Sequence, residues 1–184
     1  GPGAIGGAYI HERYHHPQTP RFAGWWGNDK ATQFLMQKGF QPMSSAQGWQ
    51  LSTPPPMLYA AHKASLELFE EAGMHRLHEK RKLLNNWLWF LLDELNARQP
   101  EPIIEFITPR NEEERGCQVS MLMLRHGRKI FDALARAGVI VDWREPNVIR
   151  LAPAPLYNSF EEVWQFTNIL QQILEQTHDT PTTG

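Results

Sequence analysis

The longest periodic pattern in the sequence covers residues 57–98, where apolar side chains recur at the three- and four-residue spacing of a helix. Gly73 lies inside this pattern, and glycine weakens a helix at an internal position. The pattern therefore predicts a long helix with a break or bend near Gly73. Because long amphipathic helices often connect two domains, we expect the segments before and after this helix to belong to different domains.

After Pro100 the sequence alternates between short apolar segments and amphipathic ones. The predicted elements are strands at 103–108, 116–124, 139–143 and 148–151, and helices at 128–137 and 160–176. A glycine, Gly138, follows the first of these helices, a position where glycine commonly ends a helix. Burying these segments together requires a sheet backed by helices. Residues 100–177 are therefore predicted to form a small α/β domain, and 178–184 a frayed polar tail.

The last predicted strand carries a candidate binding residue, Arg150, in the segment NVIRLAPAPLYNSF (147–160). Pro153 and Pro155 follow and cannot donate backbone hydrogen bonds, so they end the strand. Ser159 is suited to cap the next helix. An arginine that faces a rigid loop offers paired donors to a carboxylate. The alternative is a structural arginine paired with a nearby acid, and spacing alone favours that alternative.

The first 56 residues contain two tryptophans, Trp25 and Trp26, between glycines in RFAGWWG (21–27). Neighbouring side chains on an extended segment point in opposite directions, so one indole can pack inward while the other offers its N–H to an anionic oxygen. The alternative is that both rings fill core or interface volume. Further on, Ser52 and Thr53 present hydroxyls before three prolines, which hold an extended entry to the helix; simple helix-start chemistry is the alternative there.

Two short elements are predicted in the same region. Residues 8–11 are expected to form a strand, and 30–38 a short helix with Phe34 and Leu35 pointing inward. The chain opens with a glycine-rich turn, GPGAIGG, and has no starting methionine, so we expect a fragment that begins inside a domain. Histidines nearby lack a convincing ligand set, and no metal site is predicted.

Composition limits the class of protein. The 184 residues are 41% apolar, enough for a core, and the formal net charge of −2 gives no indication of nucleic-acid or membrane-surface binding. No apolar run approaches the roughly 20 residues of a membrane span. The single cysteine, Cys117, excludes an internal disulfide and fits a reducing compartment, so a cytoplasmic location is expected.

Several segments together resemble kynureninase, a pyridoxal-phosphate enzyme of the aspartate-aminotransferase-like fold type I. They are GPGAIGGAYIHE, RFAGWWGNDKATQF, GWQLSTPPP, EEAGMHRLHEKRKLL, ITPRNEEERGCQV and NVIRLAPAPLYNSFEEVWQFTNIL, in this order. The resemblance covers nearly the whole chain. It implies the C-terminal part of a subunit: the incomplete end of the large cofactor-binding domain (1–56), a long bridging helix (57–99) and the small α/β domain.

The resemblance also implies roles for individual residues. Trp25 and Thr53 match contacts to the cofactor phosphate, although the family commonly has asparagine at the second position. Arg150 matches the arginine that binds the substrate α-carboxylate, and Trp26 and Ser52 match residues that line the site. Asn28 replaces a frequent histidine beside the tryptophan pair.

The family's cofactor lysine lies upstream of the opening glycine turn. None of the lysines present matches it; they are Lys30, Lys38, Lys63, Lys80, Lys82 and Lys129. No catalytic residue is therefore assigned in this chain, which is expected to be inactive alone.

The implied activity is hydrolytic Cβ–Cγ cleavage of L-kynurenine or 3-hydroxykynurenine, giving anthranilate or 3-hydroxyanthranilate and L-alanine, in tryptophan catabolism and NAD biosynthesis. The implied partners are the missing N-terminal part and a second subunit of a homodimer. Two alternatives remain. One is another pyridoxal-phosphate lyase of the cysteine desulfurase-like class, which would need a reactive cysteine loop. The other is a non-catalytic α/β interaction module, which should be monomeric and well folded alone.

Overall fold

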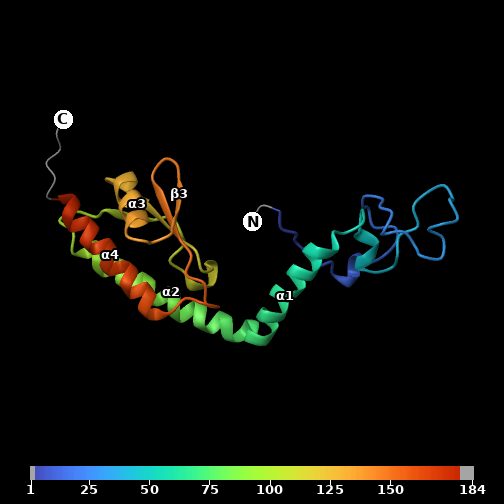
Figure 1. Cartoon of the computed structure of the whole chain (residues 1–184), viewed down its shortest axis with the longest axis horizontal. Helices are drawn as coiled ribbons and strands as arrows, with labels where there is room; N and C mark the ends of the chain where they lie inside the picture. The colour runs from blue at the N-terminus through green and yellow to red at the C-terminus, as the bar shows by residue number, and fades with distance from the viewer. Residues whose placement is uncertain (1–2, 179–184) are drawn as a thin grey trace. The chain divides into compact units, whose positions relative to one another are not determined.

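The computed structural model describes residues 3–178, and the chain divides into two compact units, unit 1 (1–71) and unit 2 (72–184) (Figure 1). Unit 1 contains η1 (Glu12–Tyr14), η2 (Ala46–Trp49) and α1 (Pro56–Ala72), whose last residue falls at the boundary. Unit 2 contains α2 (Met74–Ala97), β1 (Ile104–Phe106), η3 (Glu112–Glu114), β2 (Val119–Met123), α3 (Gly127–Arg136), β3 (Asp142–Arg144), β4 (Val148–Leu151) and α4 (Phe160–His178). The end of the predicted tail, 179–184, and the first two residues of the glycine-rich opening lie outside the described part.

The predicted break in the long helical pattern is confirmed. Gly73 adopts a positive φ of 79° between α1 and α2, a backbone conformation that glycine adopts without steric cost. The two helices differ in burial, since α1 has no buried residue while α2 buries Leu77, Leu84, Leu88 and Leu95 from the predicted stripe. The pattern at 57–98 therefore forms two helices, and only the second contributes to a hydrophobic core.

The predicted strand at 8–11 is wrong. These residues have no regular secondary structure, and the described part of unit 1 holds only an isolated bridge between Asn28 and Pro42. A strand needs a neighbouring strand to satisfy its backbone groups. Without such a neighbour in unit 1, the apolar character of this segment is insufficient to form one.

The predicted helix at 30–38 is also wrong, because this segment forms successive turns. Asp29 accepts a hydrogen bond from the backbone N–H of Ala31 at 2.8 Å, a local contact that favours turns over helix. Met36 has a positive φ of 54°, which is incompatible with a continuing helix. Phe34 and Leu35, predicted to point inward, are exposed, so the segment buries no apolar face.

Unit 2 is built on a four-stranded antiparallel sheet with the strand order β1-β2-β4-β3. All four strands predicted from the sequence are present, and the predicted range 148–151 coincides with β4. Helices α2, α3 and α4 supply the apolar side chains that pack against the sheet, and α2 lies beside α4 (Figure 1). The predicted sheet backed by helices is therefore confirmed.

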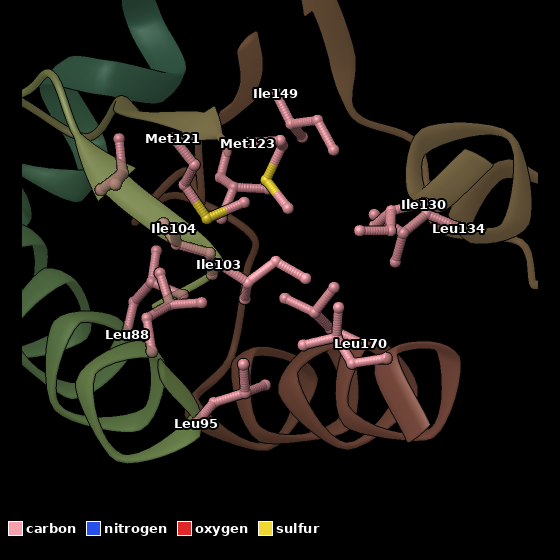
Figure 2. Packing of buried hydrophobic residues seen from close by; sticks show 14 of the residues in the cluster. Leu88, Leu95, Ile103, Ile104, Met121, Met123, Ile130, Leu134, Ile149 and Leu170 are labelled. Atoms are coloured by element: carbon pink, nitrogen blue, oxygen red, sulfur yellow. The ribbon is translucent and has the colours of Figure 1, made fainter. Parts of the chain in front are cut away.

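A single hydrophobic cluster joins one face of this sheet to the helices. Met121, Met123 and Ile149 point from the strands toward Leu88 of α2 and Leu170 of α4, as Figure 2 shows. These five side chains are almost fully buried. Burial of each large aliphatic side chain is worth about 1.5–3 kcal/mol, so this cluster is the main source of stability in unit 2.

Helix α3 ends at its C-terminus next to Gly138, the glycine that the sequence analysis singled out. The N–H of Val139 donates to the Leu134 carbonyl at 2.9 Å, and the N–H of Gly138 donates to the Ala135 carbonyl at 3.1 Å. Together with the φ of 81° at Gly138, these bonds form a Schellman motif. The prediction that Gly138 closes this helix is confirmed.

Within residues 3–178, no helix combines the length and the apolar character needed to cross a bilayer.

Candidate functional site

The two faces of the unit 2 sheet have different chemistry. Core residues alternate along β2 and β4 with half-buried ones, and the register places Ser120, Arg150 and Asp142 side by side on three adjacent strands. Since successive side chains of a strand point to opposite faces, these three lie on the face away from the helices. We call this the outer face; it consists of Glu105, Ser120, Leu122, Asp142, Arg144, Val148 and Arg150.

Arg150 makes an ion pair across this face with Asp142. Its Nε donates to Asp142 Oδ2 at 2.6 Å, and its Nη2 donates to the same oxygen. The Arg150 side chain keeps 29% of its surface exposed, and Asp142 keeps 44%. The alternative considered from the sequence, an arginine paired with a nearby acid, is therefore present in the structure. The pair, however, lies on a partly open surface and not in the core.

The pairing leaves part of the Arg150 guanidinium available. Nε and Nη2 form one edge of the group, and Nη1 with Nη2 forms another. No hydrogen bond from Nη1 reaches any of residues 3–178. The second edge can therefore still receive a carboxylate, the role that the kynureninase resemblance implies for this arginine.

The loop that follows β4 is fixed by local hydrogen bonds. Asn158 Oδ1 accepts from the N–H of Ala154 at 2.7 Å, and the N–H of Asn158 donates to the Ala154 carbonyl at 2.8 Å. Ser159 and Glu162 then form a reciprocal cap at the start of α4: the N–H of Ser159 donates to the Glu162 carboxylate at 2.7 Å, and the N–H of Glu162 donates to Ser159 Oγ at 3.1 Å. The predicted cap at Ser159 is confirmed, and it holds the chain that leaves the arginine strand.

A second group of predicted residues lies in unit 1. Trp26 donates from its indole Nε1 to Thr53 Oγ1 at 2.7 Å, which joins the tryptophan loop to the segment before the three prolines. Lys30 Nζ lies 4.5 Å from the centre of the Trp26 ring and donates to the Trp26 carbonyl at 2.8 Å. Ser52 is exposed next to Thr53. The structure thus brings Trp26 and Thr53 together.

Trp25 takes no part in that hydrogen bond. Its ring meets Phe34 edge-on, with 5.4 Å between ring centres, and its indole Nε1 has no acceptor within the described part of the chain. It keeps 47% of its surface exposed and lines an open pocket together with Asn28 and Gln33. An exposed indole N–H without a partner is free to donate to an anionic oxygen.

Glycines hold the tryptophan loop against the segment that precedes Thr53. A Cβ atom added to Gly24 would lie 2.3 Å from the Gln50 carbonyl oxygen, and one added to Gly27 would lie 2.7 Å from the same atom. Only glycine permits this backbone approach. The glycines in RFAGWWG therefore bring the two tryptophans beside residues 48–53.

Asn28 is occupied by local contacts. Its Oδ1 accepts from the N–H of Gln41 at 2.9 Å, and its Nδ2 donates to Thr32 Oγ1 at 3.3 Å. The side chain therefore closes the loop between residues 28 and 41, a structural role that the sequence did not indicate.

Asp142 is the functional candidate that sequence reasoning missed. It lies in the predicted strand 139–143, but no local pattern distinguishes it from other strand acids. Its relation to Arg150 depends on the pairing of β3 with β4, which places the two residues directly opposite each other. A hairpin register derived from the short 145–147 connection is the only sequence signal that could have indicated it.

No group of three or more histidine, cysteine, aspartate or glutamate side chains suited to a metal ion occurs in the described part of the chain.

The fold of this chain is similar to the folds of two solved proteins. A cysteine desulfurase of Thermococcus onnurineus NA1, solved in its apo form, superposes with a TM-score of 0.67 at 19% identity, covering 91% of this chain and 42% of the desulfurase. A C-DES mutant with glycine covalently linked to its PLP cofactor superposes with a TM-score of 0.65 at 18% identity, covering 89% of this chain and 40% of that protein. The architecture is that of the C-terminal part of a fold type I subunit, as predicted.

Sequence comparison identifies the family within that class. The model of the kynureninase C-terminal domain matches residues 77–170, so the chain belongs to the kynureninase family. A kynureninase of Flavobacterium johnsoniae is 47% identical over 173 residues, which cover 94% of this chain and 40% of that protein. A kynureninase of Myxococcus xanthus is 47% identical over 172 residues, covering 93% and 39%. The chain thus spans about 40% of the length of the curated relatives it matches.

Proposed function

We propose that this chain is the C-terminal part of a kynureninase. The complete enzyme adds water to the γ-carbonyl of L-kynurenine or 3-hydroxykynurenine and breaks the Cβ–Cγ bond. The γ-carbon becomes the carboxyl group of anthranilate or 3-hydroxyanthranilate, while Cβ gains a proton and leaves with the α-carbon, the amine and the α-carboxylate as L-alanine. The single observation that carries this proposal is 45–47% identity with curated kynureninases over 90% or more of the chain. That identity includes both units and is not confined to the family-model region.

The cofactor of the proposal is pyridoxal phosphate, which, when bound, withdraws electrons from the substrate α-carbon. Two side chains of unit 1 fit its phosphate group. Trp25 has an exposed indole N–H without an acceptor among residues 3–178. Thr53 Oγ1 already accepts from Trp26 at 2.7 Å, which leaves the hydroxyl hydrogen of Thr53 free to donate. Trp25 and Thr53 would therefore hold the phosphate, and Trp26 and Ser52 would line the substrate site.

Arg150 is the proposed substrate-binding residue. Its free guanidinium edge matches the planar, paired acceptors of an α-carboxylate. Binding the carboxylate fixes the rotation of the substrate about its α-carbon and hence the orientation of the bond that reacts. Ser120, directly opposite Arg150 on β2, flanks the same position on the outer face.

The complete enzyme would need a further polypeptide segment and a second subunit. Residues N-terminal to this chain would supply the cofactor lysine, and two subunits would form a homodimer. The single cysteine agrees with a cytoplasmic enzyme.

The desulfurase-like alternative is less well supported. Such an enzyme needs a thiolate nucleophile, whereas burial raises the pKa of Cys117 above its ordinary value of 9.0. The thiol therefore stays protonated at neutral pH. The low identity with the desulfurases supports the shared fold alone.

The experiment is a borohydride trap on the complete polypeptide that contains this chain. After addition of pyridoxal phosphate and reduction, intact mass should show one pyridoxyl group on a lysine outside residues 1–184, and the unreduced protein should release anthranilate from L-kynurenine. The 184-residue chain alone is the matched control and should remain unlabelled. A specific label on one of its own lysines, or a complete protein that cleaves cysteine and not kynurenine, would overturn the proposal.

A further inference from the structure

We infer that Asp142 is a positioning residue that holds one edge of the Arg150 guanidinium and thereby directs the other edge toward the substrate α-carboxylate. The inference rests on the proposed function, and it assigns a role to a residue that sequence reasoning did not identify.

The backbone fixes the two residues before any side-chain contact forms. Asp142 and Arg150 are direct partners in the antiparallel pairing of β3 with β4, so both side chains leave the sheet on the outer face. Pairs of this kind bring their Cβ atoms within about 4.5–5.5 Å. The acid therefore meets the arginine near the base of its side chain, and this short reach favours contact with Nε.

The contacts themselves define an orientation. Asp142 Oδ2 accepts from both Nε and Nη2, which are the two donors of one guanidinium edge. Two bonds to one planar group fix its rotation about the last side-chain torsion. The Nη1 and Nη2 edge then points along the side chain and away from Asp142, where it has donors left for a second carboxylate.

The charges around Asp142 also favour binding of a carboxylate. An arginine fully neutralised by one aspartate would attract a substrate anion weakly. Arg144, two residues after Asp142 on the same strand and face, places its Nη2 3.2 Å from Asp142 Oδ2. One carboxylate thus lies between two guanidinium groups, and the three side chains together carry a formal charge of +1. This group can bind a single carboxylate without leaving an unpaired charge.

The test uses the complete enzyme and a matched pair of substitutions. Asp142→Asn retains the shape of the side chain and removes its charge. Asp93→Asn is the control, because Asp93 also forms an ion pair with an arginine, Arg110, at 2.6 and 2.9 Å, and its side chain is also 44% exposed. Asp93 lies on α2, which packs against the opposite face of the sheet, so its loss should leave kinetics unchanged.

Kinetic constants and inhibition distinguish a loss of carboxylate recognition from a general loss of structure. Loss of an orienting, charge-assisted hydrogen bond should raise the KM for L-kynurenine about tenfold with kcat changed less than about threefold. Inhibition by kynurenamine, which has the same aryl ketone and amine but no carboxylate, should change less than about twofold. In an Arg150→Ala background, Asp142→Asn should have no further effect, because Asp142 acts through Arg150.

The outcomes distinguish this inference from the proposed function. A wild-type enzyme without kynurenine cleavage would contradict the proposed function itself. If the wild-type enzyme cleaves kynurenine and the Asp142→Asn variant has the same KM and kcat as Asp93→Asn, the proposed function stands and the role of Asp142 is overturned. Equal weakening of kynurenine and kynurenamine binding would assign Asp142 a purely structural role.

Discussion

The indole N–H of Trp89 donates to Asn85 Oδ1 at 3.1 Å, one helical turn apart on α2 and inside the core of unit 2. Asn85 also donates from Nδ2 to the Cys117 carbonyl at 3.3 Å, so this buried amide joins the helix to the segment that leads into β2. Both residues are less than 5% exposed. Buried polar groups of this kind are costly when they lose a partner.

Asn85→Ala should therefore lower the free energy of unfolding by about 1–3 kcal/mol, because the buried Trp89 N–H loses its acceptor and the Cys117 carbonyl loses a donor. Chemical unfolding followed by circular dichroism measures the change. Asn86→Ala is the matched control: the neighbouring Asn86 is exposed and bonds to Glu112 and Arg115 at the surface. Equal effects from the two substitutions would contradict the assigned difference in burial.

The cap of α4 gives a prediction about pH. Hydrogen bonds from Ser159, the backbone N–H foremost, lower the pKa of Glu162 below its ordinary value of 4.5. A carboxyl with a lowered folded-state pKa stabilises the folded state above its unfolded pKa, and this contribution disappears as pH falls through the folded value. Glu162→Gln should therefore destabilise the protein at neutral pH, and the difference from wild type should shrink in acid.

Thermal unfolding of both proteins from neutral to acid pH measures this effect. Ser159→Ala provides a second measurement, with an expected loss of about 1 kcal/mol at neutral pH. A wild-type advantage that grows in acid would show that the sign of the Glu162 pKa shift is wrong.

Alanine substitutions at two glycines test the cost of backbone strain without steric crowding. Gly138 and Gly116 each have no atom within 4 Å of an added Cβ, but only Gly138 has a left-handed φ, of 81°. Gly138→Ala should cost about 1–2 kcal/mol of unfolding free energy because a Cβ disfavours that conformation. Gly116→Ala should be neutral or should stabilise by about 0.4–1 kcal/mol through the unfolded chain. Urea midpoints of the two variants test this difference.

The two neighbouring tryptophans should differ in their effect on the cofactor. Trp25→Phe removes an indole N–H that has no acceptor within residues 3–178, and it should weaken pyridoxal phosphate binding to the complete enzyme about tenfold if that N–H meets the phosphate. Trp26→Phe removes the 2.7 Å bond to Thr53 and should have the smaller effect. Titration of cofactor absorbance measures both, and the reverse order would assign the phosphate contact to Trp26.

Unit 2 was predictable because its signals are local. The strand pattern at 148–151, the glycine at 138 and the serine at 159 each indicate an element boundary through the chemistry of a few neighbouring residues. The core side chains follow the same periodicity: Leu77, Leu84, Leu88 and Leu95 of α2 are buried, and Leu91 is partly buried.

Unit 1 was less predictable because its segments lack such periodic signals. Residues 8–11 have strand-forming side chains but no partner strand, and 30–38 have helix-forming residues but bury no apolar face. Propensity is a weak signal where tertiary context does not support it. The Asp142–Arg150 pair was missed for a related reason, since it depends on strand register and not on either residue alone.

The alternation along the unit 2 strands also has an evolutionary consequence. Val119, Met121, Ile149 and Leu151 point to the helices, whereas Ser120, Leu122, Val148 and Arg150 occupy the positions between them. Stability and the proposed carboxylate recognition are therefore encoded at interleaved but separate positions of the same short segments. A lineage can change the chemistry of the outer face by substituting every second residue, while the hydrophobic packing that keeps the domain folded is inherited intact.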